Sequence, residues 1–278
     1  MNEVSIIKNT GETVIFDPKK LSNSLLQSGA SKADANYVTK YICDRIVDGM
    51  STRKVYKLAY GLLKKRSLKV AGKYRLKKAI FDLGPTGYPF ESLVSELIKL
   101  KGYATESGVI LNGKCVTHEV DVFATKLNTT VFVECKFHND VHKKSDVKVS
   151  LYVNSRFHDL KNKYMQDVDS KHVFEGWLVT NTRFTSDAID FGTCAGLKMI
   201  SWDYPTNGNL KQLIDLSGFY PITTMQTITK KEKAYLLNHK VILCRQVNNK
   251  RNLLKEMGIK EKRISRIIEE VNQISNIV

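Results

Sequence analysis

Apolar residues recur along this chain either every three or four positions, as in helices, or every second position, as in strands. The first 83 residues mainly show the helical spacing. Two β-rich apolar runs on either side of a Gly-containing turn predict a β-hairpin over residues 4–16. Asp17-Pro18 then marks a helix start, because Asp caps a helix N-terminus and Pro fits its first position. Apolar residues recurring every three or four positions predict further helices over residues 32–47, 52–65 and 71–83.

The central stretch is rich in strands. An amphipathic helix is expected over residues 90–101, and a three-stranded meander with a turn at Asn112-Gly113 follows it. A meander followed by alternating helices and strands predicts an α/β domain with a mixed sheet. The strands are expected over residues 103–111, 117–126, 129–137, 173–180 and 197–202, and the later helices over residues 147–165 and 185–194.

After residue 205 the pattern is helical again. The segment Gly84-Pro85-Thr86-Gly87 ends the first run of helices, and Pro and Gly commonly separate structural units. We therefore predict a hairpin-capped helical unit at 1–83, a mixed-sheet domain at 84–205 and a helical region at 206–278. The helices of this last region are expected over residues 209–216, 229–238, 241–257 and 261–276.

Basic residues are concentrated in the two flanking parts. The 278 residues carry a formal net charge of +16, of which residues 1–83 contribute +10, residues 84–205 contribute −1 and residues 206–278 contribute +7. Basic flanks suit a polyanion, namely nucleic acid or nucleotide phosphates. No apolar run is long enough to cross a bilayer, and the five Cys residues form no CxxC pair. We therefore expect a cytoplasmic protein with reduced thiols and no membrane partner.

The most specific chemical pattern lies in the meander. Asp121 stands in the second strand, and Glu134 and Lys136 stand in the third, inside the apolar run VFVECKF. Residues i and i+2 of a strand share a face, so Glu134 and Lys136 project together. If the two strands pair as a hairpin, Asp121 can lie beside Glu134. Two carboxylates suit Mg²⁺ or Mn²⁺, which would activate a water beside a phosphate, and Lys136 would stabilise the developing charge.

Residues 84–205 resemble the Mrr-like branch of the PD-(D/E)xK restriction endonucleases. This resemblance implies metal-dependent hydrolysis of DNA phosphodiesters, with Asp121 and Glu134 as metal ligands and Lys136 as the catalytic lysine. It also implies that Glu91, in the opening helix, assists the metal site. The matching motifs are Phe90-Glu91, Gly102-Tyr103, Asp121 and Glu134-Cys135-Lys136.

Residues 1–83 contain the motifs IKNTG, FDPKKL and DGMST. On these motifs the segment resembles the ATP-cone, a regulatory nucleotide-binding domain. This resemblance implies that Lys8 and Lys20 contact the phosphates of ATP or dATP and that Thr52 marks the helix start beside them. Because ATP-cones act largely through oligomerisation, it also implies a homo-oligomer whose state changes with nucleotide.

A few further residues are candidates for substrate contact. His138 follows the Glu-x-Lys strand in a segment expected to be an exposed loop. Arg156 lies on the next predicted helix and could position the DNA backbone, although an ion pair with Asp159 is an alternative. Asn181 and Arg183 follow the fourth strand and are expected to approach DNA.

Together with the carboxylate pattern, the two resemblances imply a nucleotide-regulated, Mg²⁺- or Mn²⁺-dependent DNA endonuclease with a role in defence against foreign DNA. Two alternatives stay open at this point. One is a catalytically silent DNA-binding regulator that responds to ATP or dATP. The other is an RNase on the same fold.

Overall fold

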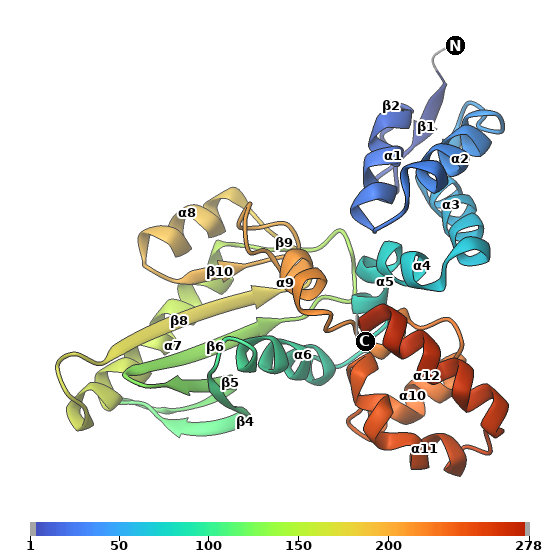
Figure 1. Ribbon diagram of the computed structural model, residues 1–278. Coiled ribbons are helices and arrows are strands. Elements are labelled where there is room, and N and C mark those ends of the chain that lie inside the picture. The colour runs from blue at the N-terminus through green and yellow to red at the C-terminus, as the bar shows by residue number, and fades with distance from the viewer. Residues whose placement is uncertain (1–3, 276–278) are drawn as a thin grey trace.

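A five-stranded mixed sheet forms the centre of the molecule. The computed structural model describes residues 4–275 and is shown in Figure 1. The strand order is β10-β8-β6-β5-β4, in which β4, β5 and β6 are antiparallel neighbours, whereas β6, β8 and β10 run parallel. This arrangement confirms the predicted mixed sheet. The strands are β4 (Ala104–Asn112), β5 (Thr117–Lys126), β6 (Thr129–Lys136), β8 (Val173–Thr180) and β10 (Lys198–Ile200).

Helices cover both faces of this sheet (Figure 1). Helix α6 (Tyr88–Lys99) packs Phe90 and Leu93 into a cluster with Val133 of β6. Helices α7 (Val147–Tyr164) and α8 (Ser186–Cys194) belong to a second cluster, which includes Phe132, the residue before Val133 in β6. Successive residues of β6 therefore point to opposite helical layers, which explains its nearly continuous apolar sequence.

The N-terminal unit contains the predicted hairpin and helices. Asp17 caps the first helix through its carboxylate, which accepts hydrogen bonds from the amides of Lys19 and Lys20. The pattern missed a third strand, only two residues long, which pairs parallel with β1 in the register Ile7–Ser51. The elements are β1 (Ser5–Ile7), β2 (Thr13–Ile15), α1 (Pro18–Gln27), α2 (Lys32–Cys43), β3 (Met50–Ser51) and α3 (Thr52–Arg66).

The single helix expected over residues 71–83 is wrong. Two shorter helices, α4 (Leu68–Tyr74) and α5 (Leu76–Phe81), meet at Arg75 instead. The cause lies in packing, because the two helices bury their apolar residues in different cores. Val70 of α4 packs with the N-terminal helices, whereas Ile80 of α5 packs with α6 and the C-terminal region.

The C-terminal region is helical, as predicted, except in one segment. The helix expected over residues 241–257 is wrong in its first half, where the chain runs extended and then forms the 3-10 helix η3 (Cys244–Lys250). The apolar run pairs with another segment, since the Ile222 amide donates to the Ile242 carbonyl and the Cys244 amide donates to the Tyr220 carbonyl, each at 2.8 Å. The regular helices are α9 (Leu210–Ser217), α10 (Lys230–Asn238), α11 (Arg251–Glu256) and α12 (Glu261–Ser275).

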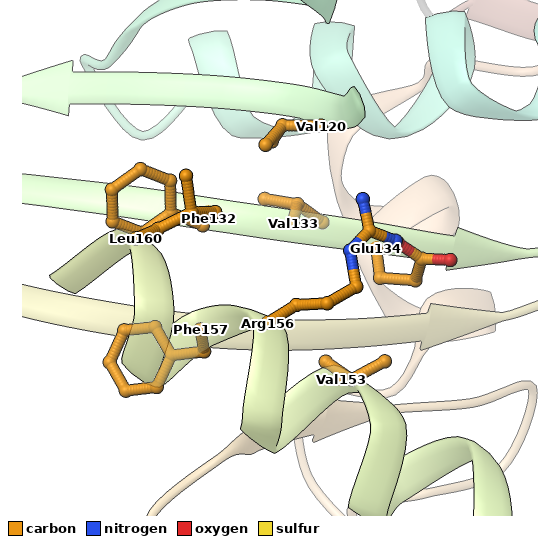
Figure 2. A pocket seen from close by; sticks show the side chains of 8 residues that line it. All are labelled: Val120, Phe132, Val133, Glu134, Val153, Arg156, Phe157 and Leu160. Atoms are coloured by element: carbon orange, nitrogen blue, oxygen red, sulfur yellow. The ribbon is translucent and has the colours of Figure 1, made fainter. Parts of the chain in front are cut away.

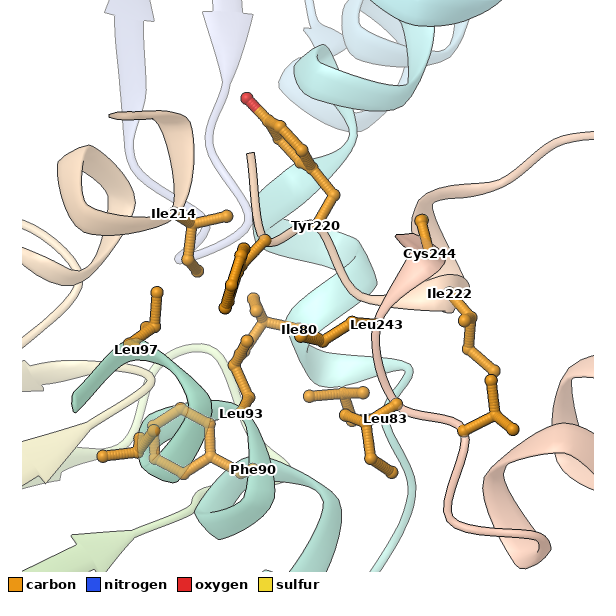
Figure 3. Close-up of a cluster of buried hydrophobic side chains, with 14 of the residues drawn as sticks. Ile80, Leu83, Phe90, Leu93, Leu97, Ile214, Tyr220, Ile222, Leu243 and Cys244 are labelled. Atoms are coloured by element: carbon orange, nitrogen blue, oxygen red, sulfur yellow. The ribbon is translucent and has the colours of Figure 1, made fainter. Parts of the chain in front are cut away.

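One apolar core joins the C-terminal region to the sheet domain. Figure 3 shows Ile80 and Leu83 close to Phe90 of α6 and to Tyr220 and Leu243 of the C-terminal region. The core therefore runs across the boundary expected after residue 83. No helix within residues 4–275 combines the length and the apolar composition that a membrane crossing requires.

Candidate active site

Asp121 and Glu134 come together where β5 and β6 part. The ladder between these strands includes the pair Val122–Val133, which makes Asp121 and Glu134 the next residues in register. The amide of Cys135 donates to Oδ2 of Asp121 at 2.7 Å. A side-chain carboxylate thus takes a hydrogen bond from the end of the ladder, and this contact ties Asp121 to the strand that carries Glu134.

Glu134 is held from the opposite side by Arg156 of α7. Nη1 of Arg156 lies 2.6 Å from Oε2 of Glu134, and Nη2 donates to the backbone carbonyl of Glu119. Figure 2 shows the two side chains pointing toward each other across the space between α7 and β6. The apolar cavity beside them measures about 20 Å³, which leaves room for about one water molecule. Any larger ligand must therefore approach Glu134 from another side.

The carboxyl groups of this region are desolvated and repel each other. Burial, and then the charge of Asp121, raise the pKa of Glu134 to about 7, although Arg156 favours its charged form. Burial also raises the pKa of Asp121, against the hydrogen bond from Cys135. Such perturbed carboxylates are typical of functional sites, because a purely structural role rarely keeps several acids together away from water.

Glu91 reaches the same group of acids from α6. Burial, followed by repulsion from Asp121, Glu119 and Glu134, raises its pKa to about 7. Its side chain folds back over Gly87 at the helix start, where a Cβ atom would stand 2.7 Å from Oε1 of Glu91. Gly87 therefore leaves the space that this carboxyl group occupies.

Lys136 is the last residue of β6, the central strand of the sheet. The carboxyl ends of the parallel strands β6 and β8 meet there in register, Lys136 opposite Thr180, and the Lys136 side chain is exposed. Beyond these strand ends, the short strands β7 (Lys144–Ser145) and β9 (Arg183–Phe184) form a parallel pair that the sequence pattern did not predict. Ligand sites of α/β proteins commonly lie just beyond the carboxyl ends of the parallel strands.

Three of the proposed substrate residues are placed differently from the expectation. His138 is buried rather than exposed, with Nε2 2.9 Å from the Ser145 hydroxyl. Asn181 is also buried, and its amide group binds the backbone of His138 at 2.8 and 2.9 Å. Arg156 is turned toward Glu134 rather than outward. Arg183 is exposed and pairs with Asp203 at 2.6 Å, which leaves it at the edge beyond β8.

The alternative ion pair between Arg156 and Asp159 is wrong. Asp159 instead lies 2.8 Å from Nε2 of His118 and accepts the backbone amides of Cys115 and Val116 at the turn between β4 and β5. His118 is first among the groups that lower the pKa of Asp159 to about 2. Arg156 and Asp159 thus both fasten α7 to β5, the strand that carries Asp121.

A divalent metal fits this donor set by its chemistry. Within residues 4–275, no group of three or more His, Cys, Asp or Glu side chains is arranged to hold a metal ion. Mg²⁺, however, is usually held by one or two carboxylates together with waters and substrate phosphates. Asp121 and Glu134 would supply two such oxygen ligands, and a dication would offset the repulsion from Asp121 that, after burial, raises the pKa of Glu134.

The residues expected to bind a nucleotide lie on the surface of the N-terminal unit. Lys8 follows β1 and pairs with Glu12 at 3.0 Å, and Lys20 is exposed on α1. Thr52 is the first residue of α3, after the N-cap Ser51. The parallel register Ile7–Ser51 brings Lys8 and Thr52 to the same end of adjacent strands.

Comparison with protein families identifies two regions of the chain. Residues 85–205 match a family described as restriction endonuclease, which confirms the resemblance of this domain to Mrr-like enzymes. Residues 220–275 match a family described as AF1548-like, C-terminal, which the sequence reasoning did not anticipate. The resemblance of residues 1–83 to an ATP-cone stays a prediction.

Individual relatives cover most of the chain. An uncharacterized protein of Archaeoglobus fulgidus is 31% identical over 183 residues, which are 65% of this chain and 99% of the relative. The crystal structure of a protein of unknown function, AF1548, has 29% identity and a TM-score of 0.55, over 69% of this chain and 99% of that one. The MspJI restriction endonuclease in complex with a 27-mer oligonucleotide, at 14% identity over 69% of this chain and 44% of its own, has a TM-score of 0.28, too low to support an argument. The chain therefore belongs to the AF1548-like family and carries a restriction-endonuclease domain over residues 85–205.

Proposed function

We propose that this protein is a metal-dependent DNA endonuclease whose active site is formed by Asp121, Glu134 and Lys136, here called the carboxylate site. The observation that carries the proposal is the pairing of two desolvated carboxylates with an exposed lysine at the carboxyl edge of β6. A Mg²⁺ or Mn²⁺ ion bound there supplies an activated water and neutralises charge on the scissile phosphate. The domain match to restriction endonucleases supports the same reaction class.

Each residue of the carboxylate site is assigned a role that follows from its surroundings. Asp121 and Glu134 would hold the metal. Lys136 shares a strand face with Glu134 and stays exposed, so its ammonium group can stabilise the charge that develops on the phosphate. Glu91 has a pKa of about 7, raised mainly by burial, and can hold a proton near neutral pH beside the two ligands.

Arg156 acts in this proposal as a positioning residue. Its guanidinium group spans Glu134 and the Glu119 carbonyl, so it fixes the carboxylate of β6 relative to the backbone of β5. A bidentate span of this kind sets both the distance and the orientation between two strands. DNA is then expected to contact the exposed edge near Lys136 and Arg183 rather than Arg156.

The test is a cleavage assay with full-length protein on labelled duplex DNA and on RNA of the same sequence. Internal cuts in DNA with Mg²⁺ or Mn²⁺, and none in EDTA, are expected. Cleavage of RNA alone would establish the RNase alternative. DNA binding without cleavage under any metal condition would establish the silent regulator. Either of the last two outcomes contradicts the proposal.

We further propose that the N-terminal unit binds ATP or dATP and changes the oligomeric state of the enzyme, which acts in the cytoplasm against foreign DNA. The observation in favour is the β1–β3 register, because it sets Lys8 beside the first turn of α3. Free backbone amides at a helix start and a nearby lysine are what a phosphate group needs. A symmetric dimer would also pair two active sites for cutting both DNA strands.

A further inference from the structure

A cleft of about 280 Å³ lies between the N-terminal and C-terminal helices, and none of the carboxylate-site residues lines it. Its walls come from the end of α3, the start of α4, the 226–227 segment and α12. The lining residues are Lys64, Leu68, Gln226, Thr227, Arg263 and Arg266. Three of these six residues are cations and none is an acid.

One of the three cations is rigidly placed. Arg263 binds both carboxylate oxygens of Glu232, at 2.6 and 2.7 Å, and donates to the Thr227 carbonyl at 2.9 Å. Glu270 is buried and accepts hydrogen bonds from the amides of Gln226 and Thr227, which holds this part of the lining in place. Arg263 and the 226–227 segment are therefore held in place, the first by Glu232 and the second by Glu270.

The other two cations are available to a ligand. Lys64 and Arg266 are exposed, and within residues 4–275 neither makes an ion pair or a side-chain hydrogen bond. They come from different parts of the fold, α3 and α12, and face one cleft. A phosphate group bound in the cleft could pair with both of these unneutralised cations.

The charge distribution of the chain favours a DNA backbone phosphate as the occupant. The restriction-endonuclease part, residues 84–205, has a net charge of −1, so it offers no net attraction to a polyanion beyond local contacts such as those expected at Lys136 and Arg183. The two parts that form the cleft carry +10 and +7. Affinity for DNA comes largely from neutralising backbone phosphates, so the two basic parts are suited to supply much of it. In the cleft, cations from both parts line one opening.

We propose that this cation cleft, defined by Lys64, Arg263 and Arg266, binds a backbone phosphate of the DNA substrate and holds the duplex outside the catalytic domain. The proposal rests on the proposed nuclease function for its substrate. It assigns a binding role to the joint between the N-terminal and C-terminal helices, at a place that contains no catalytic residue.

The test compares two double variants of equal charge in the full-length chain, with Asp121→Asn present in all samples to prevent cleavage. Lys64→Gln with Arg266→Gln removes the two available cations of the cleft. Lys65→Gln with Lys262→Gln removes two exposed cations from the same helices that do not line the cleft. Fluorescence anisotropy then gives the affinity for a labelled duplex at several salt concentrations, and thermal melting checks folding.

We expect the cleft variant to bind DNA more weakly than the parent protein. Its plot of log K against log salt should also be less steep, by about 0.9 for each phosphate that is no longer neutralised. The control variant should keep the slope of the parent protein, and Lys64→Arg with Arg266→Lys should restore binding. Equally weakened binding in the cleft and control variants would overturn the cleft proposal. So would a cleft variant that no longer binds ATP but keeps DNA binding. A parent protein that binds no DNA would instead refute the nuclease function itself.

Discussion

The carboxylate site and the proposed nucleotide site, here called the lysine site (Lys8, Lys20 and Thr52), are built in opposite ways. The carboxylates of the first are desolvated and held by neighbours, with Asp121 bound to the Cys135 amide and Glu134 to Arg156. The lysines of the second are exposed, and Lys8 makes a surface ion pair with Glu12. Catalysis requires charged groups fixed in advance at some cost in stability, whereas phosphate binding needs only accessible donors.

The largest effect is expected at the carboxylate site. Asp121→Asn or Glu134→Gln should each reduce Mg²⁺-dependent DNA cleavage to background, because each removes a charged metal ligand while preserving side-chain shape. Cleavage of labelled duplex DNA measures the loss. Glu106→Gln, an exposed acid on β4, is the matched control and should cut at the parental rate. A folded Glu134→Gln protein with parental activity would show that the site is misassigned.

Replacing Lys136 should have a smaller effect, which falls on the cleavage rate and not on metal binding. Lys136→Met should lower the single-turnover cleavage rate by about 100- to 1000-fold, as expected for loss of one charge-stabilising donor, while metal affinity stays close to the parental value. Lys171→Met, an exposed lysine next to the amino end of β8, serves as the control. If Lys136→Met weakened metal binding as strongly as the rate, the lysine would act on the carboxylates rather than on the phosphate.

Glu91 gives a test that depends on pH. Its pKa of about 7 in the folded protein lies above the ordinary value of 4.5, so the folded state binds more protons than the unfolded state between these values. Stability of the metal-free protein should therefore fall as the pH rises through this window. Glu91→Gln should remove that contribution, which makes the variant more stable than the parent at pH 8 and nearly equal at pH 4.

Urea unfolding at the two pH values measures this difference, and Glu96→Gln on the same helix is the control. A Glu91→Gln variant that is less stable at pH 8 would mean that the carboxylate is stabilised, not strained, by its neighbours.

The lysine site should show the smallest effect. Lys8→Ala with Lys20→Ala should weaken binding of ATP or dATP and abolish any nucleotide-dependent change in particle size, while cleavage without nucleotide stays constant. The change in folding stability should be slight, because an exposed ion pair such as Lys8–Glu12 contributes about 0–1 kcal/mol. Light scattering and cleavage with and without nucleotide measure both properties. Lys32→Ala with Lys40→Ala on α2 is the control, and equal responses in the two variants would refute the assignment.

Local sequence signals predicted most of the elements. The spans expected for β5 and β8 agree with the structure, and Asp17-Pro18 marks the start of α1 as predicted. The proximity of Asp121 and Glu134 could also be predicted, because strand alternation and a tight hairpin determine it. These features depend on residues close together in the sequence, which is why one sequence was enough.

The features that were missed depend on distant partners. The extended run that ends before Cys244 looks like a helix until its hydrogen bonds with residues 220–222 are known. His138 follows a strand and reads as a loop residue, but Ser145 and Asn181 enclose it. Arg156 has Asp159 three residues away in the same helix, yet β6 offers the closer carboxylate. In each case a tertiary contact outweighs the local pattern.

Direct measurement of metal binding tests the central claim, that Asp121 and Glu134 together hold a divalent ion for DNA cleavage. Electron paramagnetic resonance can count bound Mn²⁺ in the presence of an uncleavable duplex. We predict a bound Mn²⁺ in the parent protein that is absent from both Asp121→Asn and Glu134→Gln, with Glu106→Gln unchanged. Parental Mn²⁺ binding in both of the first two variants would contradict the claim.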